Sequence, residues 1–208
     1  MKSPTSAAQT ARKPARASRA IRPYHHGNLR VGLLEAADAV LAERGAQALT
    51  LREVARAAGV SHGAPYHHFT SLNDLLAAVA QRGFEALGDA MAQAVAVADT
   101  RERLLRVADA YVACARAHPE RFRLMFGPLL ARKEEHPALQ AAAQRAFGFV
   151  LAAATAHDKK NGGDLALAGW SLAHGLSHLM IDGAFDGLPM KKQSPDTLAR
   201  KLSERMFG

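Results

Sequence analysis

Apolar residues recur at every third or fourth position along most of this sequence, a spacing typical of amphipathic α-helices. Glycine and proline signals such as His118-Pro119, Gly127-Pro128 and Asn161-Gly162-Gly163 divide the pattern into segments. The predicted helices cover 28–44, 51–58, 62–68, 73–94, 101–117, 119–130, 137–157, 164–185 and 195–206, and either Asn73 or Ser71 is placed to open the fourth of them. Because the pattern contains no convincing strand pair and no repeat, we expect an all-α protein of about nine helices.

Two of the shortest segments are joined by Gly-Val-Ser at 59–61 and follow a longer amphipathic helix. This is the pattern of a helix-turn-helix unit. Thr50 and Glu53 have the spacing of a capping box at the start of the first short helix. Gly59 is expected to end that helix in the left-handed conformation, and Ser61 is placed to cap the next one.

The second short helix needs few core residues, so most of its side chains are free to face outward. Pro65 falls in or next to its first turn, where a missing N–H matters least, and Phe69 anchors it. The outward side chains are expected to be His62, Tyr66, His67 and His68. These histidines lack the spacing of three or four residues that brings metal ligands together on one helix face. We therefore expect them to contact a partner rather than a metal ion.

The net charge of +8 is concentrated at the start of the chain. Seven cations precede the first acid, Glu35, and they are Lys2, Arg12, Lys13, Arg16, Arg19, Arg22 and Arg30. Residues 1–23 are rich in Ser, Ala, Pro and Arg without apolar periodicity, so we expect a disordered basic arm. Such an arm suits a polyanionic partner, although a solubilising tail has the same composition.

Other features of the composition bear on the compartment. No apolar run approaches the ~18 residues of a membrane span, and no apolar stretch follows the N-terminal charges as in a signal peptide. Cys114 is the single cysteine, which excludes an intramolecular disulfide and fits a reducing cytoplasm. We expect a cytoplasmic protein with no membrane association and Cys114 as a small core residue.

The stretch TLREVARAAGVSHGAPYHHF at 50–69 resembles the DNA-binding domain of the tetracycline-repressor (TetR) family, with a likeness over about residues 24–80. The resemblance implies a helix-turn-helix domain at 24–72, a connecting helix at 73–98, and an effector-binding and dimerisation domain at 99–208. It also implies a homodimer bound to a pseudo-palindromic operator in double-stranded DNA. The residues expected to contact DNA are Thr50, Arg52, Ser61, His62, Gly63, Ala64, Pro65, Tyr66, His67 and His68.

The sequence departs from the family pattern at Leu72, where many members have a lysine that contacts a phosphate. Phosphate binding is therefore expected to shift towards Arg52, Arg56 and the N-terminal arm. The second short helix also lacks the Asn, Gln or Arg that makes bidentate contacts with bases. Sequence specificity is expected from Ala64 or Pro65 against thymine methyls, from single histidine hydrogen bonds, and from DNA shape.

The stretch WSLAHG at 170–175 resembles the Trp-His-Gly motif of one ligand-domain subgroup of the same family. The resemblance implies an internal pocket, and the bulky apolar side chains of this half favour an apolar or aromatic effector. The residues expected to line the pocket are Tyr111, Phe122, Met125, Phe126, Phe147, Leu151, Trp170, His174 and His178. Tyr111, His174 and His178 are the expected polar groups among them.

An alternative use of the same helix is metal binding. His174, His178 and Asp182 follow one another at four-residue intervals, and such a row can hold zinc or iron in a metal-dependent enzyme or sensor. The helix lacks the glutamate that follows the first histidine in HExxH proteases, and its other residues are mostly apolar. We favour the regulator, with no catalytic residues and no cofactor.

The segment 164–185 is apolar nearly all round, so we expect it to be buried against a partner. Together with 195–206 it is predicted to form a four-helix homodimer interface. Gly169 and Gly175 would allow close approach of the helices. The helix from 73 leaves the DNA-binding domain for the effector domain, so an effector that tilts it would change the separation of the two DNA-binding units.

Overall fold

The structure is a computed structural model that describes residues 29–186 and 193–207. The predicted basic arm at 1–23 lies outside these described residues. The α-helices are α1 (Leu29–Arg44), α2 (Leu51–Ala58), α3 (Leu72–Ala94), α4 (Thr100–Ala117), α5 (Pro119–Phe126), α6 (Pro137–His157), α7 (Gly162–Ile181) and α8 (Pro195–Met206). Three short 3₁₀ helices are η1 (Ala46–Ala48), η2 (Ala64–His67) and η3 (Lys133–Glu135). The all-α prediction is confirmed, with eight α-helices in the described residues and η2 in place of a predicted ninth.

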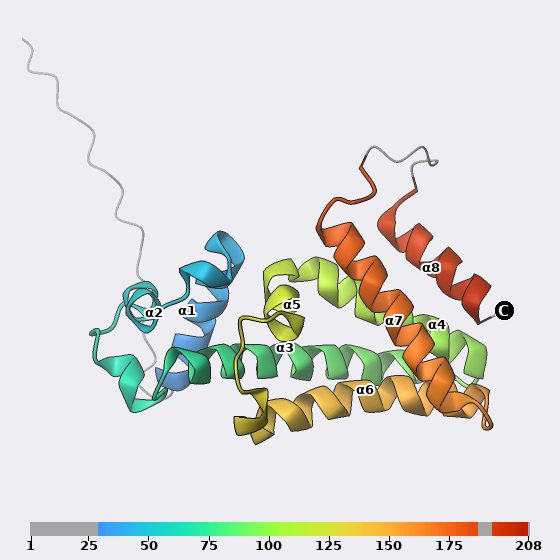
Figure 1. Cartoon of the computed structure of the whole chain (residues 1–208), viewed down its shortest axis with the longest axis horizontal. Coiled ribbons are helices and arrows are strands. Elements are labelled where there is room, and N and C mark those ends of the chain that lie inside the picture. Colours follow the sequence, from blue (N-terminus) through green and yellow to red (C-terminus); the bar gives the residue numbers. More distant parts are fainter. Residues whose placement is uncertain (1–28, 187–192, 208) are drawn as a thin grey trace, which may run out of the picture.

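The helices form two regions along one long axis (Figure 1). α1, α2 and η2 lie at one end and pack on the start of α3; we call this unit, residues 29–71, the reading head. α3 then runs beneath the second region with α6 beside it, and α4, α5, α7 and α8 complete that region. α3 therefore links the two regions through one continuous helix.

Two helices end earlier than their apolar pattern predicts. α5 ends at Phe126 instead of 130 because Pro128 disfavours the helical conformation at Gly127. α7 ends at Ile181 instead of 185, where Gly183 takes a left-handed φ of 67°. The Ala184 N–H then donates to the Leu179 carbonyl at 2.9 Å, which closes the helix end.

One continuous hydrophobic core joins the reading head to the second region. Leu33 and Leu41 of α1 and Leu75 and Val79 of α3 are almost completely buried within it. Gly83 of α3 lies against Met125 of α5 so closely that an added Cβ would lie 2.5 Å from the methionine sulfur. Among the described helices, none combines the length and the apolar character needed to cross a bilayer.

Candidate nucleic-acid interface and effector site

Thr50 starts α2 as the sequence predicts, and its hydroxyl accepts a hydrogen bond from the Glu53 N–H at 3.1 Å. Gly59 ends α2 in the left-handed region, with φ 71°. The expected capping box is incomplete, because the Glu53 carboxylate does not turn back to Thr50. It pairs instead with Arg44 and with Arg56, whose Nη2 lies 2.5 Å away. These two guanidinium groups lower the pKa of Glu53 to about 2, with Arg56 having the larger effect.

The predicted helix at 62–68 is the 3₁₀ helix η2, and Ser61 does not cap it with its side chain. Its backbone bonds span three residues, as in the 2.9 Å bond from the His68 N–H to the Pro65 carbonyl. Pro65 and Phe69 are both almost fully buried and fix the segment to the reading head. A buried Pro65 cannot reach a thymine methyl, so its role is to anchor the segment rather than to read DNA.

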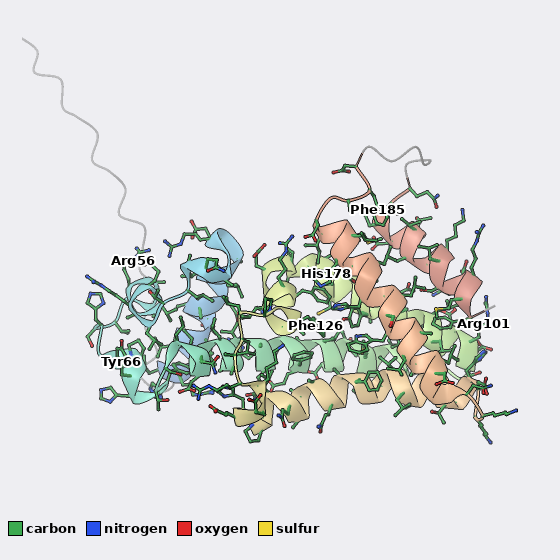
Figure 2. All side chains as sticks on the ribbon, in the orientation of Figure 1. Arg56, Tyr66, Arg101, Phe126, His178 and Phe185 are labelled. Atoms are coloured by element: carbon green, nitrogen blue, oxygen red, sulfur yellow. The ribbon has the colours of Figure 1, made fainter. Side chains whose placement is uncertain are left out.

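The other predicted contact residues lie at the surface. Tyr66 exposes 61% of its surface at the tip of the reading head (Figure 2). Exposed side chains or backbone are also found at Thr50, Arg52, Ser61, His62, Gly63, His67 and His68, whereas Ala64 is half-buried. The buried anchors on one side of η2 thus leave an aromatic ring and three imidazoles facing outward.

Ser71 opens α3 through a complete capping box with Asp74. The Ser71 hydroxyl accepts from the Asp74 N–H at 3.1 Å, and the Asp74 carboxylate accepts from the N–H groups of Thr70 and Ser71. The Thr70 hydroxyl also donates to the Asp74 carboxylate, and this bond has the largest part in lowering the pKa of Asp74. Leu72 follows with 38% of its surface exposed, so the first turn of α3 presents an alkyl group and no cation at this position.

A cation that sequence reasoning did not assign to this surface lies at the start of α1. The Arg30 guanidinium carbon lies 5.5 Å from the centre of the Phe69 ring. Arg30 is exposed, and Phe69 is the buried residue that follows η2 and His68. The sequence carries no local signal for this contact, because the two residues belong to different elements.

The reading head is fastened to the second region by an ion cluster. Asp38 of α1 accepts from Arg121 of α5 at 2.9 Å and 3.0 Å, and Arg82 of α3 lies 3.2 Å from its other oxygen. Beside this cluster, α1 and the α4–α5 turn border a groove of about 240 Å³. α5 therefore contacts the reading head directly, in addition to the link through α3.

The predicted polar groups of the effector region form one hydrogen-bonded chain. Trp170 Nε1 donates to the Tyr111 hydroxyl at 3.3 Å, and that hydroxyl lies 2.8 Å from His174 Nδ1. Burial raises the pKa of Tyr111, which keeps its proton available as a donor. Burial and then His178 lower the pKa of His174, which favours a neutral ring that accepts at Nδ1.

Aromatic rings surround this chain. Phe126 lies 4.7 Å from His174 between ring centres, and Phe122 lies 5.2 Å from His178. Both phenylalanines belong to α5, and both histidines belong to α7. The same short helix thus carries Arg121 towards the reading head and two rings towards the histidines.

The proposed metal row does not converge. The His174 and His178 ring centres are 4.7 Å apart, but Asp182 pairs with Arg123 at 2.6 Å. Across residues 29–186 and 193–207, no group of three or more His, Cys, Asp or Glu side chains is arranged to hold a metal ion. Cys114 is half-buried, and its surroundings raise its thiol pKa, as expected for a packing residue.

Two apolar cavities of about 20 and 30 Å³ lie around Trp170, each large enough for about one water molecule. Both cavities are bordered by Met91, Tyr111, Val150 and Trp170. Of the other predicted pocket residues, Phe126 and Phe147 line the second cavity. Neither cavity is lined by Phe122, Met125, His174 or His178. Leu151 lines neither cavity either, and it is 40% exposed at the surface.

α7 presents a row of partly exposed residues at intervals of four along one face. Leu167 and Leu179 expose 52% and 46% of their surface at its two ends, with Ser171 and Gly175 between them. A Cβ added at Gly175 would meet no atom within 4 Å. Gly169, which is also predicted to allow close approach of a partner helix, faces its own chain instead, because Phe207 at the end of α8 would lie 3.0 Å from an added Cβ there.

Two family models match the chain over most of these elements. Residues 33–79 match the model described as "Bacterial regulatory proteins, tetR family", which covers most of the reading head and the first third of α3. Residues 104–206 match "Tetracyclin repressor-like, C-terminal domain", which covers nearly all of α4 to α8.

Individual proteins agree with these matches. The HTH-type transcriptional repressor KstR2 of Mycobacterium tuberculosis is 48% identical over 44 residues, 21% of this chain and 22% of that protein. The HTH-type transcriptional activator FasR of Mycolicibacterium smegmatis is 36% identical over 95 residues, 45% of this chain and 43% of that protein. The match thus spans less than half the length of either relative.

Solved structures resemble the chain over nearly its whole length. A Rhodococcus sp. RHA1 protein of unknown function is 32% identical with a TM-score of 0.73, covering 90% of this chain and 97% of that one. The TetR family regulator PfmR of Thermus thermophilus shares the fold at 24% identity and a TM-score of 0.63, covering 84% of this chain and 96% of that one.

Proposed function

The chain belongs to the TetR family of DNA-binding transcriptional regulators, and on that premise we propose that it is a homodimeric repressor released from its operator by a small apolar or aromatic effector. Family membership makes it a transcription regulator rather than an enzyme. The observation that carries the proposal is the exposed surface of η2, held by buried Pro65 and Phe69. We propose the boundaries 24–72, 73–98 and 99–208 for its DNA-binding unit, connecting helix and effector domain.

DNA contact is proposed through η2 in the major groove and the start of α2 at a phosphate. The Thr50 hydroxyl and the free N–H groups of α2 suit an anion. Arg52 is exposed and pairs with no acid among the described residues, so its charge is available. Hydrogen bonds to base edges or to the sugar–phosphate backbone are proposed from the side chains of Tyr66, His62, His67 and His68.

The homodimer is proposed to form through α7 and α8. The row of partly exposed residues on α7 has leucines at its ends and the small Ser171 and Gly175 at its centre, which lets a second helix approach closely. α8 packs beside α7 through Phe207, which leaves Gly169 to an intramolecular role. Two copies of the pair give an isologous interface, which places the two reading heads about a two-fold axis.

The effector is proposed to bind around Trp170, where the Trp-His-Gly subgroup assignment would also place it. Cavities of about 20 and 30 Å³ are far smaller than the ≈ 300 Å³ or more of a ligand pocket. We therefore propose that the side chains bordering both cavities, Trp170 among them, move when the effector binds. That movement would disturb Tyr111 and His174, which contact the rings of α5.

α5 provides a second mechanical connection between the proposed effector site and the reading head, in addition to a tilt of α3. Phe122 and Phe126 contact the histidines of α7, and Arg121 holds Asp38 of the reading head. An effector that displaces the rings would shift the head relative to its partner in the dimer. Release follows only if the effector binds the shifted state more tightly than the DNA-bound state.

We expect binding to DNA that flanks the protein's own gene to weaken steeply with salt. Each neutralised phosphate contributes a slope of about −0.9 in log affinity against log salt, so contacts by Arg52 and Arg56 in both protomers give about −3.6. Fluorescence anisotropy between about 0.05 and 0.2 M salt measures the slope. A flat response, or equal affinity for scrambled DNA of the same length, would contradict operator binding.

Trp170 is the single tryptophan, so its emission reports on the proposed effector site. We expect neutral aromatic compounds, screened as a panel, to change Trp170 emission saturably and to lower operator affinity over the same concentrations. Val150→Phe fills both cavities and should weaken this response, whereas Leu151→Ala at the surface should not. Operator release without any change in Trp170 emission would place the effector elsewhere.

A further inference from the structure

The proposed DNA-binding surface around η2 has no Lys, Arg, Asp or Glu side chain of its own. From residue 57 to residue 73 the sequence contains no Lys, Arg, Asp or Glu. Leu72 is exposed within this stretch and cannot bind a phosphate. Since phosphate contacts supply much of the affinity of DNA-binding proteins and set their register, cations from other elements must border this surface.

Two of the nearby arginines are engaged by an acid. Arg44 and Arg56 both pair with Glu53, which is 22% exposed at its side chain and ionised because its pKa is about 2. One carboxylate therefore offsets part of the charge that these two side chains would offer a phosphate. Arg56 remains 65% exposed, so it can approach DNA, but only in exchange for its bonds to Glu53.

Arg30 is differently placed. Its guanidinium lies over the Phe69 ring with 5.5 Å between the carbon and the ring centre. No acidic side chain pairs with it in the described part of the chain. A guanidinium that uses its flat face against a ring keeps the N–H donors around its edge free. Those donors match the paired oxygens of a phosphate.

Phe69 also explains why Arg30 has a defined position. The ring is 2% exposed and belongs to the core of the reading head, so it does not move with solvent-exposed loops. An arginine held on such a ring has lost part of its conformational entropy before DNA arrives. His68, which precedes Phe69 and is exposed, brings the predicted DNA surface to the same place.

We propose that Arg30 is a phosphate-contacting residue of the reading head, held in position by Phe69, and that it supplies the cation that Leu72 cannot. The partner group is a phosphodiester of the operator backbone. The contact carries no base information, so it strengthens binding to all duplexes in similar proportion. This inference rests on the proposed binding of operator DNA.

Arg30→Gln tests the proposal, because it removes the charge and keeps much of the side-chain length. Loss of one phosphate contact in each protomer should make the salt slope shallower by about 1.8. At 0.15 M salt, operator affinity should fall by roughly 10- to 100-fold, and affinity for scrambled DNA should fall with it. Arg30→Lys, which retains the charge without the planar group, should recover most of the slope.

Lys159→Gln is the matched control, since it removes one exposed charge from the turn between α6 and α7, and Figure 1 shows this turn far from the reading head. It should leave the slope unchanged. If Arg30→Gln lowers the melting temperature but keeps the wild-type slope, Arg30 is structural and the proposal is wrong. If wild-type protein itself shows a flat slope, operator binding fails first, and the two failures are therefore distinguishable.

Discussion

Replacing Gly175 with leucine is expected to convert the protein to a monomer without harming the fold of the chain. A Cβ added at Gly175 meets no atom within 4 Å, so the side chain can leave the helix without a clash at its first atom. Leucine also has a helix propensity higher than glycine by about 1 kcal/mol, which should raise the stability of α7. In the proposed dimer the same side chain would hold the two α7 helices apart.

The consequence for DNA binding should be large. Two linked reading heads bind an operator with an affinity that can exceed that of one head by a factor of about 10² to 10⁴. The Gly175→Leu variant should lose this gain while each head stays folded. Light scattering gives the oligomeric state, anisotropy gives the operator affinity, and the melting temperature shows that the chain is folded.

Gly148→Leu provides the matched control, because Gly148 is a helical glycine on α6 with equally open surroundings. It should remain dimeric and bind the operator as the wild type does. Leu179→Gln gives a second test, since a side chain that is 46% exposed in the monomer tolerates a polar replacement. Should both α7 variants stay dimeric, the interface lies on another face.

The sequence predicts the helices well because their signals are local. Apolar spacing and end signals such as Gly45, Thr50 and Gly59 act within a few residues of where they are read. Ambiguity arises where two local signals compete. Ser71 and Asn73 are both candidates to open α3, and Ser71 opens it because only Ser71 has Asp74 three residues later. The position of Pro65 in a first turn is predictable, but its burial depends on the fold around it.

The candidate sites also contain some features that the local sequence predicts and others that depend on residues far apart in the chain. The outward positions of His62, Tyr66, His67 and His68 follow from a segment too short to bury them, and sequence spacing indicates this. The pairing of Arg121 with Asp38, or of Arg30 with Phe69, joins residues far apart in the chain, and no local pattern encodes it.

Two glycines of α7 are a further case in which the local sequence does not predict the contact. Gly169 and Gly175 look alike in the sequence, yet one faces Phe207 of the same chain and the other faces open space. The row His174, His178 and Asp182 has metal-like spacing, but Arg123 from another helix engages the aspartate. Spacing on one helix places side chains on a face; only the neighbouring helices decide what they contact.

Removing the Tyr66 side chain should abolish most operator affinity while leaving stability unchanged. Tyr66 is 61% exposed, so Tyr66→Ala should change the free energy of unfolding by no more than about 0.5 kcal/mol. A DNA contact of this kind contributes about 1–3 kcal/mol, and a symmetric dimer loses it in both half-sites. The expected loss is therefore roughly 30-fold to 10⁴-fold.

Tyr66→Phe separates the two ways in which this side chain can act on DNA. If the hydroxyl donates to a phosphate or base, phenylalanine should lose nearly as much affinity as alanine; if the ring packs against sugar or thymine methyl, phenylalanine should retain most of it. Leu151→Ala, which truncates an exposed side chain on α6, is the control and should bind as the wild type does. Wild-type affinity in Tyr66→Ala would contradict a DNA contact by η2 through this ring, which is 61% exposed between the buried anchors Pro65 and Phe69.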